Sequence, residues 1–261
     1  MDNDLKVVGL QLDLIWEDPT RNLQEILSQL SKIKNADLVV LPETFSTGFS
    51  LNAINSAYNT DSPDLALLQE WTNKNDIALC GSVWFKEEGN LTNRLLWISP
   101  HEQIQHYDKR HLFSLSDEPK VMKPGNRRLI IEYKGWRIAP LICYDLRFPV
   151  WSKNTAEYQY DILIYVANWP ERRTYAWEHL LIARAIENQS YVVGVNRVGM
   201  DGNQVNHIGA SAIINPLGEI IVRAKDNSPQ AIRGSLSKIE LNTYRDKLPF
   251  LADGDKFSFE D

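Results

Sequence analysis

The chain has 261 residues, of which 43% are hydrophobic and 24% charged, and its formal net charge at pH 7 is −6. This composition is that of a globular protein with a sizeable core, and the acidic balance, with no basic run interleaved with aromatic residues, argues against a nucleic-acid partner. Two cysteines are too few for a disulfide framework and favour a reducing, cytoplasmic setting. We expect neither a signal peptide nor a membrane span, because no apolar run approaches about 18 residues.

The first part of the chain predicts a strand, a helix and a second strand. Residues 5–14 form a nearly continuous apolar run, which is typical of a buried strand. Asp18 and Pro19 suit the N-cap and the first position of a helix. Apolar residues then recur at helical spacing: Leu23, Ile26, Leu27, Leu30 and Ile33. Residues 37–41 form a second buried strand that leads directly into Glu43, and this succession indicates helices packed on a sheet.

The middle of the chain predicts a second helix and several strands. A helix is expected to begin at Ser62 and Pro63, with Leu67, Leu68 and Trp71 on its apolar side. Lys134–Gly135 is a hairpin signal between two strands. The predicted strands are 77–85, 91–99, 103–107, 129–133 and 136–143.

The last part of the chain is expected to add two helices, more strands and a final helix. Short and long helices are predicted at 149–158 and 172–188, the second with Trp177, Leu181 and Ala185 on one side. Ser237 begins a capping box that opens the final helix. The further strands are 161–166, 191–195, 207–214, 219–222 and 231–236.

Neither an internal repeat nor a linker divides the chain. We therefore expect one domain over residues 1–261, with 249–261 as a C-terminal extension. Early strands alternate with helices, whereas later strands are joined by hairpin turns. This pattern favours an α/β fold with two mixed sheets and helices outside them over a single parallel sheet.

Three polar residues share one placement, at or just after the end of an apolar strand. They are Glu43, Lys109 and Cys143. Each alone has an ordinary interpretation, because exposed Glu and Lys are the rule and a lone strand Cys is usually core. Strand ends are, however, where side chains from distant parts of an α/β chain meet. Together they supply a base, a cation and a nucleophile, the parts that acyl transfer needs.

Other chemistries have less support in the sequence. The histidines form no HExxH motif and no pair at helical spacing, so we expect no zinc site or other metal site. No Walker A loop, GxGxxG or G-x-S-x-G motif is present, and no cofactor is expected. A Cys–His pair stays open, because His111 and His207 have no local feature that places them; a structural or surface role is favoured for both.

Three sequence blocks resemble a known family. L-P-E-T at 41–44, Y-D-K-x-H-L-F at 107–113 and I-C-Y-D-L-R-F-P at 142–149 are similar, in order, to the signature blocks of the nitrilase (carbon–nitrogen hydrolase) superfamily. The resemblance implies a four-layer α-β-β-α sandwich and a Glu–Lys–Cys triad of Glu43, Lys109 and Cys143. It also implies a second glutamate, at Glu118, and a homodimer or higher homo-oligomer.

The reaction implied is amide hydrolysis through a cysteine thioester. Glu43 is expected to act as general base toward Cys143, and Glu118 to orient Lys109 or the water. Lys109 and the backbone N–H of Tyr144 would face the oxyanion.

Within the superfamily, the C-Y-D-L-R-F block, N-W-P at 168–170 and R-A-I-E-N at 184–188 most resemble the ω-amidase branch. That branch deaminates 2-oxoglutaramate and 2-oxosuccinamate. A substrate with a remote carboxylate needs a cation away from the triad, and arginine suits this task. Arg173 is our candidate for this contact. Asn168 and Trp169 of the matching block are the other candidate substrate-binding residues. The remaining arginines considered are Arg172 and Arg197 as alternatives, and Arg147, for which a structural ion pair is expected.

Other functions remain open at the level of the sequence. A carbamoylase or an aliphatic amidase is the nearest alternative, and true nitrile hydrolysis is less favoured, because most branches of the superfamily cleave amides. A protein of a different class, a catalytically idle binding protein on the same fold, is a further alternative. The intact set of Glu43, Lys109 and Cys143 disfavours it.

Overall fold

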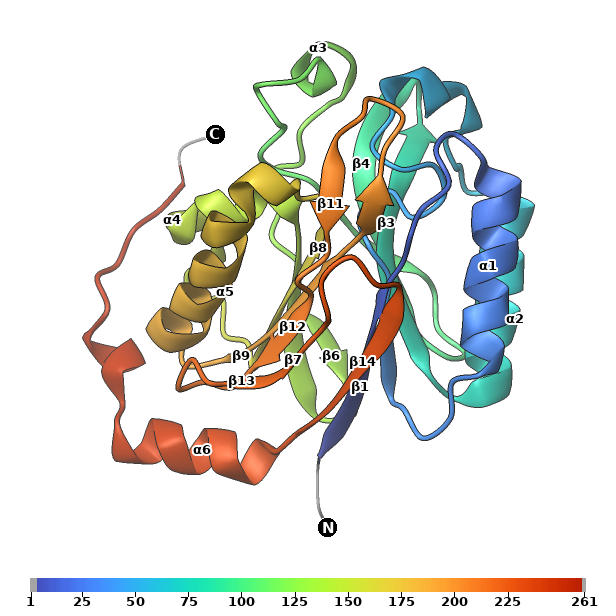
Figure 1. The fold of residues 1–261 in the computed structure, drawn as a ribbon. Coiled ribbons are helices and arrows are strands. Elements are labelled where there is room, and N and C mark those ends of the chain that lie inside the picture. The colour runs from blue at the N-terminus through green and yellow to red at the C-terminus, as the bar shows by residue number, and fades with distance from the viewer. Residues whose placement is uncertain (1–3, 260–261) are drawn as a thin grey trace.

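The computed structural model describes residues 4–259, whose strands form two six-stranded sheets and one two-stranded ribbon (Figure 1). The first sheet has the order β14-β1-β2-β3-β4-β5, with bounds Gln230–Leu236, Leu5–Gln11, Leu38–Val40, Ala78–Glu87, Asn90–Ile98 and Gln105–Asp108. The second has the order β13-β12-β9-β8-β7-β6, with bounds Ile220–Arg223, Ala212–Ile214, Tyr191–Asn196, Ile162–Ala167, Trp136–Ile142 and Ile131–Tyr133. The ribbon pairs β10 (Val198–Met200) with β11 (Asn206–Ile208).

Helices cover the outer faces of the two sheets (Figure 1). Helices α1 (Pro19–Ser31) and α2 (Pro63–Asn75) pack on the first sheet, and α5 (Thr174–Asn188) packs on the second. Helix α6 (Lys238–Lys247) follows β14. The α/β class and the four-layer α-β-β-α sandwich are thus confirmed. None of the helices within residues 4–259 combines the length and apolar character that crossing a membrane requires.

The alternation of side chains along the strands explains the continuous apolar runs in the sequence. Val7 of β1 lies in the apolar layer between the sheets, whereas its neighbour Val8 lies under the outer helices. In β2, Val40 likewise lies between the sheets and Val39 lies under the outer helices. Successive strand residues point to opposite faces, and both faces of these strands are covered. A strand with two covered faces therefore has few positions for polar residues.

Two glycines let the layers approach closely. A Cβ on Gly9 of β1 would lie 2.9 Å from Val195 of the opposite sheet, and a Cβ on Gly194 of β9 would lie 2.5 Å from Leu181 of α5. Both distances are below normal contact, so a side chain at either position would push layers apart. The central strands of both sheets can pack tightly because these positions lack a Cβ.

Parallel pairing in the centre of each sheet sets the position of the site. β1, β2 and β3 run parallel, as do β7, β8 and β9. β5 has the direction of β3, because β4 is antiparallel to both. The carboxyl ends of β2, β5, β7 and β8 are followed by Glu43, Lys109, Cys143 and Asn168.

Two predicted elements are wrong in extent. The helix predicted at 149–158 is only α4 (Pro149–Ser152), because the chain turns extended at Lys153 and the Asn154 side chain then bonds the carbonyls of Tyr160 and Asn188. The strand predicted at 207–214 is divided into β11 and β12, since Gly209 and Ala210 between them have positive φ angles of 86° and 55°.

The other helices agree with the sequence in their boundaries and faces, apart from two details. Asp18 caps α1 and Ser237 caps α6, each through its side-chain oxygen. The apolar face of α2 was wrong at Leu67, which is 45% exposed, whereas Leu65 and Leu68 are buried. The long helix predicted from 172 begins as a 3-10 turn at Glu171–Arg173, and α5 proper starts at Thr174.

Candidate active site

The strand ends of both sheets meet at a cavity of about 270 Å³. Glu43, Lys109, Cys143 and Asn168 all line it. Glu118, whose side chain is fully buried, bonds to Lys109 from behind the cavity wall. The structure therefore brings together four polar residues that are far apart in the sequence.

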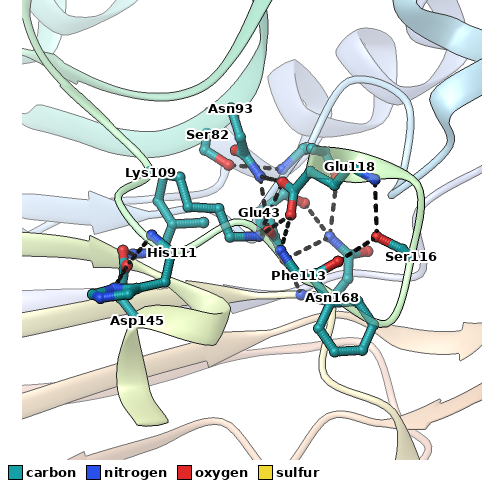
Figure 2. Close-up of polar contacts among 12 residues, drawn as sticks. Glu43, Ser82, Asn93, Lys109, His111, Phe113, Ser116, Glu118, Asp145 and Asn168 are labelled. Carbon is teal, nitrogen blue, oxygen red and sulfur yellow. Dashed lines mark hydrogen bonds and ion pairs between the residues drawn. The ribbon is translucent and has the colours of Figure 1, made fainter. Parts of the chain in front are cut away.

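Glu43 is held by donors from three segments of the chain (Figure 2). Its Oε1 accepts hydrogen bonds from Lys109 Nζ at 2.9 Å and Asn93 Nδ2 at 2.8 Å. Its Oε2 accepts one from the backbone N–H of Asn168 at 2.8 Å. The next residue, Thr44, has a positive φ of 44°, which turns the chain sharply out of the strand. A buried carboxylate with this many donors has a single orientation toward the cavity.

Lys109 is the buried cation of the site. Its Nζ lies 3.1 Å from both carboxylate oxygens of Glu118, in addition to its contact with Glu43. Burial acts to lower the pKa of Lys109, but the charges of Glu118 and Glu43 outweigh burial and raise the pKa above its ordinary value. Lys109 is therefore an ammonium ion at neutral pH.

Glu118 begins the single-turn helix α3 (Glu118–Val121) and faces inward. The backbone N–H of Phe113 donates to its Oε2 at 2.6 Å, which ties the 113–118 loop to the carboxylate that bonds the lysine (Figure 2). Burial raises the pKa of Glu118, Lys109 opposes this rise, and Glu43 adds to it. Two carboxylates and one ammonium thus share an enclosed space.

Cys143 sits at the turn from β7 into the 3-10 segment Cys143–Arg147. Its φ of 43° is in the left-handed region, which costs a non-glycine residue about 1–2 kcal/mol. Burial, followed by the charge of Glu43, raises the pKa of Cys143 well above its ordinary value, although Lys109 opposes this. The sulfur is therefore a neutral thiol at rest, and the Glu43 carboxylate, which lines the same cavity, is the neighbouring proton acceptor.

Tyr144 and Asn168, which line the cavity with Cys143, also bring backbone N–H groups to the site. Tyr144 is the second residue of the 3-10 segment, so the segment itself provides no acceptor for its N–H. The N–H of Asn168 interacts with Cys143 as well as with Glu43. The Asn168 side chain bonds the Glu43 carbonyl at 2.7 Å and Thr44 Oγ1 at 3.0 Å. Asn168 therefore joins β8 to the loop that carries the glutamate.

Three arginines also line the cavity, namely Arg147, Arg172 and Arg173. The guanidinium of Arg173 lies 5.0 Å from the Phe113 ring centre, and that of Arg147 lies 4.9 Å from the Trp169 ring centre. Burial lowers the pKa of Arg173, and the neighbouring cations Arg172 and Arg147 lower it further. Mutual repulsion of this kind marks a place where an anion would be stabilised.

Two arginine assignments need correction. Arg147 was expected to form a structural ion pair, but within residues 4–259 no carboxylate pairs with it, because its side chain lies over the Trp169 ring on the cavity wall. Arg197 does not line this cavity. It is fully buried, and its guanidinium bonds the carbonyls of Val198 and Leu14.

Asn93 was not predicted at the site from the sequence, and His207 was considered there without being placed. Asn93 of β4 donates to Glu43 at 2.8 Å and to Glu118 at 3.3 Å, which bridges the two carboxylates. An asparagine buried in a strand is costly unless its amide is hydrogen-bonded, and that cost was the available signal. His207 of β11 lines the cavity, and burial, together with Arg197, lowers its pKa to about 4.

The fold and this arrangement define a class of protein. The family model described as carbon–nitrogen hydrolase matches residues 7–245, and the chain belongs to that family. Among residues 4–259, no cluster of three or more His, Cys, Asp or Glu side chains could hold a metal ion.

Individual relatives refine this class. The chain is 45% identical over 253 residues to omega-amidase YafV of Escherichia coli strain K12, covering 97% of this chain and 98% of the relative. It is 30% identical over 248 residues to 2-oxoglutaramate amidase of Bacillus subtilis, covering 94% and 95%. Among solved structures, the superfamily protein XC1258 of Xanthomonas campestris, with an arsenic adduct in its active site, has a TM-score of 0.95 at 41% identity, covering 98% of this chain and 99% of the other.

Proposed function

We propose that the protein is an ω-amidase, which releases ammonia from the ω-amide of a 2-oxo dicarboxylic acid monoamide. One observation carries this proposal: a neutral thiol, a buried carboxylate and a buried ammonium meet in a small cavity that three arginines also line. The thiol, the carboxylate and the ammonium suit acyl transfer, and the arginines suit an anionic substrate. Its similarity to omega-amidase and 2-oxoglutaramate amidase supports the same substrate class.

The first half-reaction begins at the thiol. Glu43 takes the proton from Cys143 as its sulfur bonds to the amide carbon, and the negative charge moves to the carbonyl oxygen. Lys109 Nζ and the N–H of Tyr144 stabilise this oxyanion, which is worth about 3–4 kcal/mol for one well-placed donor. Glu43 then donates its proton to the nitrogen. The carbon–nitrogen bond breaks, ammonia leaves, and a thioester remains.

The second half-reaction repeats these steps with water. Glu43 takes a proton from the water as the water oxygen attacks the thioester carbon, and the same donors stabilise the second oxyanion. The carbon–sulfur bond breaks, and Glu43 returns the proton to Cys143. Glu118, at 3.1 Å from Nζ, holds the lysine in the position that both steps need.

A substrate panel scored by ammonia release tests this function. The panel contains 2-oxoglutaramate, 2-oxosuccinamate, an N-carbamoyl amino acid and a short aliphatic amide. We expect the highest kcat/KM for the two oxo-acid amides. A clear preference for the carbamoyl compound or for the aliphatic amide would replace ω-amidase with carbamoylase or aliphatic amidase, and a protein that hydrolysed none would support the idle binding protein.

Arg173→Ala tests the proposed carboxylate contact. We expect KM for 2-oxoglutaramate to rise about 10–100-fold, since a hydrogen bond to a charged group is worth about 1.5–3 kcal/mol. The kinetics with a neutral aliphatic amide should change little. The matched variants Arg172→Ala and Arg147→Ala show whether another arginine carries the contact. An equal loss of kcat/KM on the oxo-acid amide and on the neutral amide would contradict a role for Arg173 in binding the carboxylate. In that case Trp169 and Asn168 would shape the cavity wall and would not contact the substrate.

We also propose that the protein forms a homodimer or larger homo-oligomer through the outer face of α5. Ile186 of α5 is 48% exposed, and Leu217, just before β13, and Ile220, the first residue of β13, are similarly exposed. These side chains adjoin one another, because Gly218 lies against Ile186, and Ile182 and Ile220 line one shallow hollow. Contiguous apolar surface of this kind is typical of association sites.

The variant Ile186→Asp tests this surface. Sedimentation should show the wild type as an oligomer and the variant with a lower mass, because a carboxylate would be buried at the contact. A wild-type monomer at micromolar concentration would rule the proposal out.

We propose the cytoplasm as the compartment, in keeping with the two free thiols. We also propose that the chain is a single domain with a C-terminal extension at 249–261.

A further inference from the structure

Asp145 is a buried carboxylate that the proposed mechanism does not use. It lies two residues after Cys143, is 0% exposed and accepts four hydrogen bonds. The N–H of Ile142 donates at 3.1 Å and the Tyr107 hydroxyl at 2.8 Å. The N–H of His111 and its ring Nδ1 lie at 3.0 and 2.8 Å from the other oxygen (Figure 2). Both oxygens therefore have two partners each.

The donors come from the two segments that carry the chemistry. Ile142 immediately precedes Cys143, and Tyr107 and His111 lie two residues before and two residues after Lys109. One carboxylate thus links the turn that exposes the sulfur to the segment that presents the ammonium. Those segments are separated by more than 30 residues of sequence and belong to different sheets.

Each donor is itself held in place. The His111 ring stacks on Phe148 with centroids 3.7 Å apart and an interplanar angle of 5°. The Tyr107 hydroxyl accepts from Trp151 Nε1 at 2.9 Å and from the Arg110 N–H at 3.2 Å. The backbone N–H groups of Ile142 and His111 can only donate hydrogen bonds to Asp145, so an ionised carboxylate fits the site. The ring proton of His111 then belongs on Nδ1, which faces that carboxylate.

The link matters because two separate donors must converge on one oxyanion. Tyr144 N–H moves with the 3-10 turn, whereas Lys109 Nζ moves with the segment after β5. Cys143 also holds a left-handed φ of 43°, which the surroundings must maintain. We propose that Asp145, with His111 and Tyr107, is a positioning set that fixes the nucleophile turn relative to Lys109. This inference rests on the proposed amidase function, because its effect is on that reaction.

His111→Phe tests the proposal, since phenylalanine keeps the stack on Phe148 and loses the hydrogen bond to Asp145. We expect kcat for 2-oxoglutaramate to fall about 30-fold or more, in line with the cost of a small misplacement, with KM changed by less than about twofold. Alkylation of Cys143 by iodoacetamide should stay within about threefold of wild type, because alkylation needs the thiol and Glu43 but no oxyanion donors. His111→Asn, whose amide can donate in place of Nδ1, should recover most of the lost kcat.

Matched controls separate positioning from mere stability. His106→Phe places the same change on exposed His106 of β5 and should leave kcat unchanged. A purely structural role would lower kcat and the alkylated fraction together, in step with the folded fraction measured by thermal unfolding. That result, or a kcat within threefold of wild type for His111→Phe, would overturn the proposal.

Failure of the proposed function gives a different result. If the wild type hydrolyses another amide of the panel but not 2-oxoglutaramate, the ω-amidase proposal fails, and the comparison of kcat with alkylation is made on the amide that is hydrolysed. A wild type that hydrolyses no amide would overturn both.

Discussion

Cys143→Ala is expected to lower kcat/KM for 2-oxoglutaramate by at least about 10⁴-fold, the scale seen when a covalent nucleophile is removed. The sulfur is the one protein atom that forms a bond to the substrate carbon in the proposed mechanism, and alanine offers no substitute. Ammonia release measured at high enzyme concentration would determine the residual rate. The fold should persist, because Cys143 lies at the cavity wall and its side chain is partly exposed.

Cys80→Ala is the matched control for this variant. Cys80 is fully buried between the sheets, and burial raises its pKa well above the ordinary value, so it has no access to substrate. Its replacement should cost some stability and leave kcat/KM within about threefold of wild type. Mass spectrometry of a quenched reaction should find an acyl adduct on the peptide with Cys143 and none on the peptide with Cys80. Substantial turnover by Cys143→Ala would end the thioester mechanism.

Glu43→Gln is expected to lower kcat by about 10³-fold, within the range for loss of a general base. Glutamine keeps the size of the side chain but cannot take the thiol proton. The charge of Glu43 raises the pKa of Cys143, so removing it lowers that pKa relative to wild type. In the variant the thiolate forms only by loss of the proton to solvent. Alkylation by iodoacetamide should therefore accelerate with rising pH, by about tenfold per unit below the thiol pKa.

The wild-type alkylation rate should depend far less on pH between 6 and 8, because its proton acceptor lies inside the site. Glu118→Gln is the matched control, since it makes the same substitution at the other buried glutamate and leaves Glu43 next to the thiol. Its pH profile should resemble that of wild type. A steep profile in Glu118→Gln and a shallow one in Glu43→Gln would exchange the roles proposed for the two glutamates.

Local features of the fold were predictable because their causes lie within a few residues. Pro19 after Asp18 starts α1, and Lys134–Gly135 turns between β6 and β7 with both φ angles positive, at 46° and 78°. The helix after Pro149 shows the limit of such reasoning. Its predicted length was wrong because Asn154 bonds Asn188, a partner 34 residues away that no local pattern identifies.

The same distinction applies to the candidate site. Motif order identified Glu43, Lys109, Cys143 and Glu118 as candidates, and the structure brings them together. Asn93 and the Asp145 set were missed, because their importance comes from hydrogen bonds across 25 to 50 residues of sequence. Arg147 was assigned an ion pair on sequence distance alone, whereas the 3-10 turn places it over Trp169.

By itself the sequence determined most of the strands and helices and the two-sheet α/β architecture, and the resemblance of its three blocks to a family predicted the residue types of a thiol amide hydrolase. These follow from periodicity, turn chemistry and three short blocks, all of which are local. Only the tertiary structure decided which donors hold Glu43, which carboxylate links Cys143 to Lys109 and which arginines share the cavity. Those answers depend on how two sheets pack against each other, and side-chain alternation specifies the face a residue occupies but not the partner it meets there.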